Sequence, residues 1–250
     1  MPWNTIHNIS SEEFAVRIKS WRNSRIYHLF GIEELFFYIL EWSLSVKDVK
    51  EQYPLLPITA TIEIAERLGI KHPAYCKTKE PKVMTTSFLI DVEESGRIVT
   101  KARAVKRSIN QLNSKRAIEK LEIERTFWTG KGIDWGIVTK SDMPVVLAEN
   151  IKLLHPFLNL SEHPNITLRI ISHIEQFLID KMACSDYALA ELCLTADEQL
   201  GLEPATSLSV VKHLIASKRW DIDMGIPIST GMPIKLRNLK QLTTAGRMLA

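Results

Sequence analysis

The sequence predicts an α+β protein in which a mixed sheet flanked by helices precedes a small, mostly helical domain. Residues 82–140 predict the sheet, because they follow the order strand, turn, strand, helix, strand. The helix expected at 32–42 is apolar all round from Leu35 to Leu40, which is typical of a helix buried in a core. Beyond residue 160, apolar residues recur at helical spacing. A chain of 250 residues that is 45% hydrophobic can bury one core and a small second domain.

The first domain is expected to cover residues 1–160. Residues 2–30 are mixed in character and predict a partly irregular opening segment. Pro54 and Pro57 end one extended stretch, and the polar run at 93–96 predicts a turn between two strands. The expected elements are a helix at Ile32–Trp42, an extended stretch at Ser45–Leu56, a short helix or strand at Thr61–Leu68, strands at Met84–Asp91 and Ile98–Lys106, a helix at Ser114–Trp128, a strand at Trp135–Thr139 and a helix at Pro144–Leu158.

The second domain is expected to cover residues 161–250. Its helices are predicted at Ile166–Ile179, Asp186–Cys193 and Ala205–Ser217, and two short extended pieces follow at Trp220–Met224 and Pro233–Leu236. Three helices followed by a hairpin is the order of a winged helix, a fold that commonly contacts DNA.

The two strands of the 82–140 block carry a pattern that resembles the site of a metal-dependent endonuclease. Such a site needs an acid on one strand and a lysine on the next, with the lysine placed to orient the attacking water. Lys106 is present, and Ala104 shares its expected face because side chains alternate along a strand, while Ser87 holds the position of the acid on the neighbouring strand. Mg²⁺ usually takes one or two carboxylates, which a serine and an alanine cannot replace.

Two acids could supply a ligand near this position. Glu33 begins the apolar helix, where a buried carboxylate is costly unless it is paired or bound to metal. It is therefore either a metal ligand or one half of a structural pair. Asp91 shares the expected face of Ser87 but lies four residues along the strand, about 13 Å away, so it is not expected to fill the same coordination site without a register shift.

Other classes of site have little support in the sequence. The three cysteines show no CxxC spacing, and the seven histidines form no metal-binding pair. No glycine-rich phosphate loop and no Gly-x-Ser-x-Gly motif occurs. No apolar run approaches the length of a membrane span and no signal-peptide pattern is seen, so the sequence predicts a cytoplasmic protein with no membrane partner.

Positive charge is unevenly distributed along the chain. Between residues 101 and 118 there are six basic residues and no acid, a pattern that suits a phosphate backbone and equally suits a solvated face. The residues expected to contact DNA phosphates are Arg103, Arg107, Lys115 and Arg116.

Five strings resemble one known family. They are Arg25-Ile-Tyr-His-Leu29, Glu41–Pro57 (EWSLSVKDVKEQYPLLP), Gly69–Pro73 (GIKHP), Val83–Asp91 (VMTTSFLID) and Glu119–Trp128 (EKLEIERTFW). In this order they resemble the TnsA endonuclease subunits of heteromeric cut-and-paste transposases. The resemblance covers nearly all of residues 2–158, and further along the chain it rests on the order of elements.

The resemblance implies a restriction-endonuclease-like first domain and a winged-helix-like second domain that contacts DNA and partners. Members of this family cut the 5′ strands at transposon ends with Mg²⁺. A TnsB-like transposase of the retroviral-integrase class cuts and joins the 3′ strands, and a TnsC-like AAA+ regulator links the complex to target choice.

The catalytic set of the family is Glu, Asp, Gln and Lys. Carried over by position, the set falls on Glu33 (Glu34 if counted forward from Arg25), Ser87, Ala104 and Lys106. Since two of the four residues are replaced, the chain is expected to serve assembly and DNA binding with impaired cleavage. The alternatives are an active endonuclease that uses a substitute acid, and a DNA-binding winged-helix regulator.

Overall fold

The computed structural model describes most of the chain as two compact units, which divide at Val145/Val146. The described residues are 15–108, 110, 113–160, 166–182 and 186–238. The domain boundary expected after residue 160 stays a prediction, and the last helix expected in the first domain falls almost entirely in the second unit. No described helix has both the length and the apolar character of a membrane span.

A four-stranded mixed sheet forms the centre of the first unit. Its strands are β3 (Val46–Pro54), β4 (Thr85–Glu94), β5 (Arg97–Lys106) and β6 (Asp134–Thr139), in that spatial order. β3, β4 and β5 pair antiparallel, and β6 joins β5 in parallel after a crossover through α3 (Lys115–Thr129). Ser95 and Gly96 both have positive φ, as a two-residue hairpin turn between twisted strands requires. This mixed sheet with flanking helices confirms the predicted fold class.

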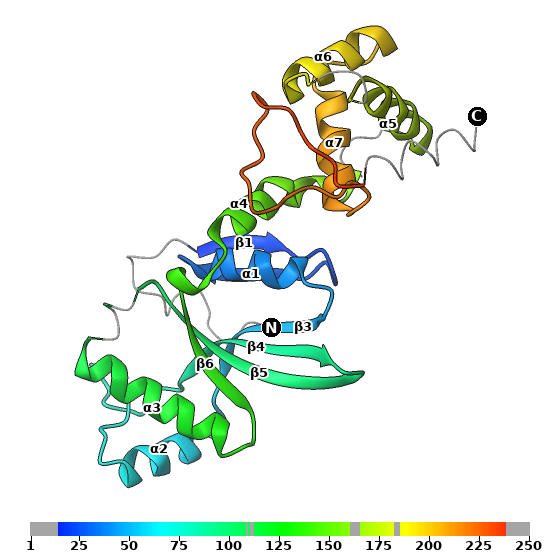
Figure 1. The fold of residues 1–250 in the computed structure, drawn as a ribbon. Coiled ribbons are helices and arrows are strands. Elements are labelled where there is room, and N and C mark those ends of the chain that lie inside the picture. Colours follow the sequence, from blue (N-terminus) through cyan, green and yellow to red (C-terminus); the bar gives the residue numbers. More distant parts are fainter. Residues whose placement is uncertain (1–14, 109, 111–112, 161–165, 183–185, 239–250) are drawn as a thin grey trace. The chain divides into compact units, whose positions relative to one another are not determined.

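Helices cover both faces of this sheet (Figure 1). On one face lie α1 (Glu33–Trp42) and the hairpin of β1 (Ala15–Lys19) and β2 (Ile26–Phe30). They are held there by a ring contact between Phe36 and Phe88 and by the Tyr27 hydroxyl, which donates to the Val49 carbonyl over 2.9 Å. On the other face α2 (Ile58–Arg67) and α3 enclose a core that includes Phe127 and Trp128.

The hairpin of β1 and β2 is missing from the prediction, which gave residues 2–30 as partly irregular. Each strand has only five residues, and Ile26 is exposed while Tyr27 and Leu29 are buried. Such short strands give a weak alternation signal. The ambiguous segment at 61–68 is helical up to Arg67, where α2 ends. The other elements predicted for this unit are present with ends shifted by a few residues.

The second unit is helical. It contains α4 (Val145–Leu154), α5 (Leu168–Met182), α6 (Leu189–Leu200) and α7 (Thr206–Ala216), with a short 3-10 helix at His155–Phe157. Ile174, Leu178 and Leu214 are almost fully buried. The Trp220 indole is also buried and donates to Glu175 over 3.1 Å.

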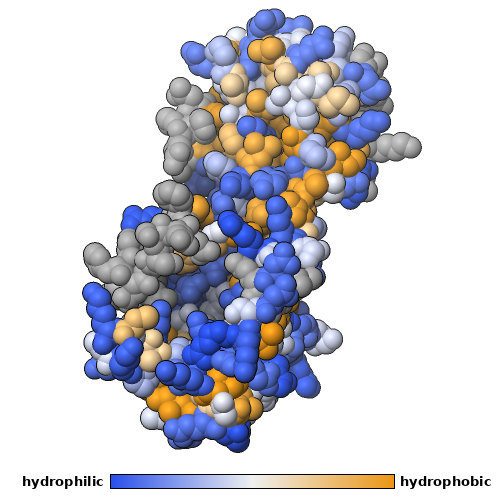
Figure 2. Space-filling model, turned by 90° about the vertical axis from the view of Figure 1, so that its left-hand side faces the viewer, coloured by the Kyte–Doolittle hydropathy of each residue, from blue (hydrophilic) through white to orange (hydrophobic). Residues whose placement is uncertain are grey.

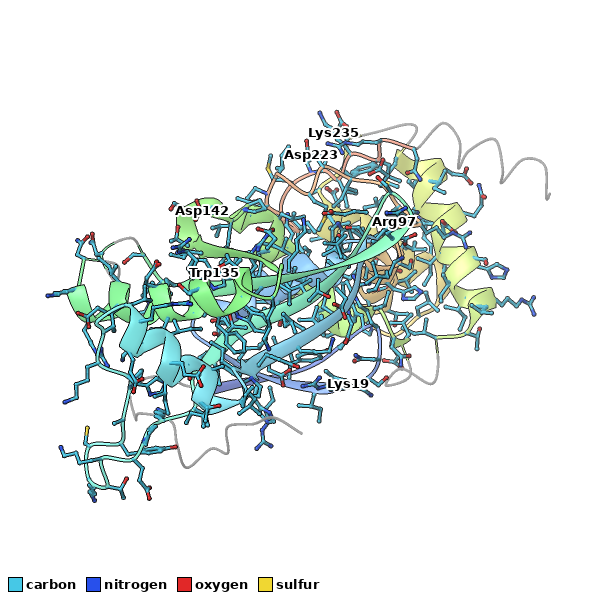
Figure 3. All side chains as sticks on the ribbon, turned by 90° about the horizontal axis from the view of Figure 1, so that it is seen from below. Lys19, Arg97, Trp135, Asp142, Asp223 and Lys235 are labelled. Carbon is cyan, nitrogen blue, oxygen red and sulfur yellow. The ribbon has the colours of Figure 1, made fainter. Side chains whose placement is uncertain are left out.

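The hairpin expected after these helices is not seen in the described residues up to 238. A backbone bond links the first stretch to the residue just after the second, from the Arg237 N–H to the Asp221 carbonyl at 2.7 Å. The loop between them instead accepts backbone bonds from the start of α6, where Leu189 donates to Met232 and Ala190 donates to Thr230. Figure 3 labels Asp223 and Lys235 on the two stretches. A winged helix therefore stays a prediction.

Candidate functional site

Strands β4 and β5 part where the sequence places the candidate site. Their ladder ends at the pair Phe88↔Arg103, while β5 continues beside β6 to Lys106↔Thr139. Beyond the end of the ladder, the Val105 N–H donates to Ser87 Oγ over 3.1 Å. A side-chain oxygen therefore replaces a strand carbonyl at this point.

Ser87 and Ala104 are both buried here, with exposed fractions of 8% and 1%. The Ser87 hydroxyl accepts the bond from Val105, and Ala104 presents a methyl group. Neither side chain offers a carboxylate. In the part of the chain that the structure describes, no three His, Cys, Asp or Glu side chains gather in a way that could hold a metal ion.

Glu33 lies at the start of α1 with 7% of its surface exposed. The Gln52 amide donates to both of its oxygens, at 2.9 and 3.1 Å, and the Phe30 N–H donates over 3.2 Å. The Gln52 carbonyl oxygen accepts a bond of 3.3 Å from the Thr85 hydroxyl. Glu33 is therefore connected to the start of β4 through Gln52, and its carboxylate already has partners.

Lys106 lines a cavity of about 570 Å³ between the start of β4 and the first half of α3. Thr85 and Glu124 line the same cavity. The Thr86 hydroxyl and the Trp135 indole both donate to one oxygen of Glu124, the latter over 3.1 Å. Figure 3 labels Trp135 on β6, beside α3. Burial raises the pKa of Glu124, and these bonds and the charge of Lys106 offset that rise only in part.

Asp91 does not take part in this arrangement. Lys50 and Thr100 donate to its two oxygens over 2.9 and 2.7 Å. Burial would raise the pKa of Asp91, but the bonds from Thr100 and Lys50 outweigh it and the pKa is lowered. Asp91 is therefore one half of a structural ion pair.

The four basic residues expected to contact DNA lie in different places. Arg103 pairs with Asp134 at 2.6 Å, on the neighbouring strand β6. Arg107 and Lys115 are exposed. Arg116 lines the same cavity as Lys106 and pairs with Glu119 at 2.9 Å. Arg116 therefore lies at the same cavity as Lys106, whereas Arg103 is held in an ion pair with Asp134.

Gln52 and Glu124 are the two residues of this region that the sequence reasoning missed as site residues. Gln52 interrupts β3 with a positive φ of 47°, which places its amide beside Glu33 and which alternation cannot predict. Glu124 stands between the apolar residues Ile123 and Phe127 in a helix whose other acids are more exposed. The position of an acid within the apolar stripe of this helix is the sequence feature that could have identified Glu124.

Comparisons with known proteins place the chain. Residues 43–140 match the family model for the TnsA-like endonuclease N terminal, and residues 142–224 match the model for the TnsA endonuclease C terminal. The chain is 34% identical over 218 residues to the transposon Tn7 transposition protein TnsA of Escherichia coli, an alignment that covers 87% of this chain and 77% of that protein. Together with the mixed sheet that precedes a helical unit, these matches show that the chain belongs to the TnsA endonuclease family.

Proposed function

We propose that this chain acts at transposon ends as the TnsA subunit of a heteromeric DNA transposase, with impaired strand cleavage. The observation that carries the proposal is the parting of β4 and β5. The Ser87 hydroxyl is uncharged and accepts the Val105 N–H, and Ala104 has no side-chain ligand. Losing several kcal/mol of transition-state stabilisation lowers a rate by orders of magnitude, since about 1.4 kcal/mol is a factor of ten.

The family suggests dependence on a divalent metal, which we take to be Mg²⁺, and the residues of this chain fit such an ion poorly. Mg²⁺ prefers near-octahedral oxygen ligands and one or two carboxylates. Glu33 is the one acid of the carried-over set, and both of its oxygens accept bonds from Gln52. Lys106 remains as a cation beside the position where the metal ligands are replaced. We therefore derive no catalytic step through a metal.

The role that remains is assembly on DNA. The relative from E. coli is named as a transposition protein, and we extend that role to this chain. The expected partners are a TnsB-like transposase that joins the 3′ strands and a TnsC-like regulator, with the second unit making DNA and partner contacts. Intact 5′ strands would bias such a complex toward replicative products.

The test is an end-cleavage assay with the partner transposase, in Mg²⁺ or Mn²⁺. It compares the natural chain with the double variant Ser87→Asp, Ala104→Gln. The control is Ser87→Asn, Ala104→Gln, which has the same size without the carboxylate. We expect 5′ cutting in the Asp variant alone. Equal 5′ cutting by the natural chain would refute the impairment, and no effect of any chain on events at the ends would refute the transposase role.

A second candidate function is an active endonuclease with Glu124 as the substitute acid. It is favoured by the position of Glu124 in the cavity that Lys106 lines. Against it, one oxygen of Glu124 already accepts two bonds and burial raises its pKa. If the natural chain cuts 5′ strands, this reading requires that Glu124→Gln abolish the cutting. Glu122→Gln, at a half-buried acid that pairs with Arg125, should leave the cutting unchanged.

A further inference from the structure

The cavity beside Lys106 is lined by four basic side chains, and we call it the basic cavity. They come from three separate segments of the chain, namely the stretch before β4, the end of β5 and the first two turns of α3. The four are Lys82, Lys106, Arg116 and Lys120. Hydrophilic side chains predominate on the face of the first unit that Figure 2 shows, apart from an apolar area at its lower edge.

Few acids balance these four charges. Arg116 pairs with Glu119, and Lys82 lies over the Tyr75 ring at 5.9 Å. Neither Lys106 nor Lys120 forms an ion pair with any residue that the structure describes. Glu124, the one acid among the lining residues, is 5% exposed and already accepts bonds from two donors. The basic cavity therefore has a net positive charge.

The charges act on one another across the basic cavity. Burial lowers the pKa of Lys120, and the charges of Arg116, Lys82 and Lys106 lower it further. Arg116 also acts on His72, whose pKa is lowered by burial and by that arginine. Like charges held together in this way are unfavourable in the free protein, and an anion placed between them would relieve the repulsion.

We propose that the basic cavity binds a backbone phosphate of DNA through Lys82, Arg116 and Lys120, next to the point where β4 and β5 part. The proposal rests on the proposed function, which supplies the DNA. Phosphate contacts of this kind fix the register of a strand without reading its sequence. The bound phosphate would therefore hold the DNA backbone beside Lys106 whether or not the strand is cut.

The lining residues favour a nucleic-acid backbone over a free nucleotide. The basic cavity, at about 570 Å³, is larger than a single phosphate group. The lining residues include no aromatic side chain on which a base could stack, and no glycine-rich loop precedes α3. Inorganic phosphate shares the same chemistry and is therefore an arm of the test.

The experiment measures binding of the full-length chain to a fluorescent 30-base-pair duplex by anisotropy, over a range of salt concentrations. The test variant is Lys82→Gln, Lys120→Gln, which leaves Lys106 in place. The matched control is Lys19→Gln, Arg97→Gln, which also removes two exposed charges from the first unit. Figure 3 labels both control residues, and Arg97 begins the strand that Lys106 ends, about 30 Å away.

We expect the test variant to bind roughly tenfold more weakly at low salt, with a salt dependence shallower by about 1 to 2 in slope, and the control to match the natural chain. When a single phosphate of the duplex is replaced by a neutral methylphosphonate, at each position in turn, one position should weaken binding by the natural chain. The same replacement should not change binding by the test variant. Unchanged melting temperatures will show that both variants are folded.

Three results would overturn the inference. They are equal binding by the test and control variants, no binding of the duplex by the natural chain at low salt, and lysine-dependent thermal stabilisation by inorganic phosphate without duplex binding. Each leaves the proposed function standing if the complex with the partner still acts at transposon ends. A complex that has no effect on the ends refutes the function, whatever the duplex shows.

Discussion

Replacing Ser87 with alanine tests whether the hydroxyl serves the backbone. The change removes one oxygen, and with it the acceptor of the Val105 N–H at 3.1 Å. Ser87 and Val105 are 8% and 6% exposed, so water cannot easily replace that oxygen. Leaving a buried donor without a partner costs about 1–3 kcal/mol. Because the lost volume is small, this penalty should account for most of the change in the free energy of unfolding.

Thermal unfolding followed by tryptophan fluorescence will measure this loss. Of the six tryptophans, Trp220 alone lies in the second unit, so the signal reports mainly on the first. For a domain of about this size, each kcal/mol lowers the melting temperature by about 2–4 °C. The expected decrease is therefore roughly 2–12 °C, and the Val105 amide should exchange with deuterium faster than in the natural chain.

The control is Ser114→Ala, since the Ser114 side chain makes no capping bond to α3 and is exposed. It should change stability by less than about 0.5 kcal/mol. An unchanged melting temperature and unchanged Val105 exchange in Ser87→Ala would show that the hydroxyl is not needed by the backbone. The bond from the Val105 N–H to Ser87 Oγ would then contribute nothing to stability, and the acceptor role inferred for Ser87 would be wrong.

Three further outcomes follow from the buried groups. Burial raises the pKa of Glu124, so its protonated form stabilises the fold at low pH and this stability is lost as the carboxyl ionises at higher pH. Glutamine cannot ionise, so Glu124→Gln should have a higher melting temperature than the natural chain at pH 8 and the same melting temperature near pH 4. Leu178→Ala should cost about 2–5 kcal/mol in the second unit and leave hydrogen exchange in β4 and β5 unchanged, because Leu178 is fully buried within that unit. Burial, with the charge of Asp197, raises the pKa of Cys193 to about 12, which suppresses its reactive thiolate. In a Cys184→Ser chain, a thiol reagent at pH 8 should therefore label only the exposed Cys76 while the chain is folded, and both Cys76 and Cys193 once it is unfolded.

The sheet was predictable because its strands and helices are long and follow one another closely. The apolar helix α1 and the block from β4 to β6 were found within a few residues of their ends. The hairpin of β1 and β2 was not found, since strands of five residues carry too few alternations. Cys184 and the C-terminal residues from 239 lie outside the described residues.

The residues of the candidate site stay a prediction, and their geometry differs from what strict alternation gives. Strict alternation puts Ser87 and Leu89 on one face, with Thr86 on the other. In the structure Thr86 bonds to Glu124 of α3, and Leu89 packs into the core that α3 covers, so residues three apart reach the same side. The positive φ of Gln52 on β3 and the end of the β4–β5 ladder both occur in this region. Alternation fails where strands bulge and part.

That irregularity also bears on our proposal that Ser87 and Ala104 stand in place of catalytic residues without disturbing the scaffold. Where β4 and β5 part, the Val105 N–H needs an acceptor, and any short side chain with an oxygen at position 87 can supply one. An aspartate would serve the backbone with one oxygen and have a second, charged oxygen for a metal ion, whereas a serine has a single uncharged oxygen. Ser87→Asn should therefore unfold close to the natural chain, because its amide oxygen can take the same bond. If Ser87→Asn is as unstable as Ser87→Ala, the acceptor requirement inferred for this position is wrong.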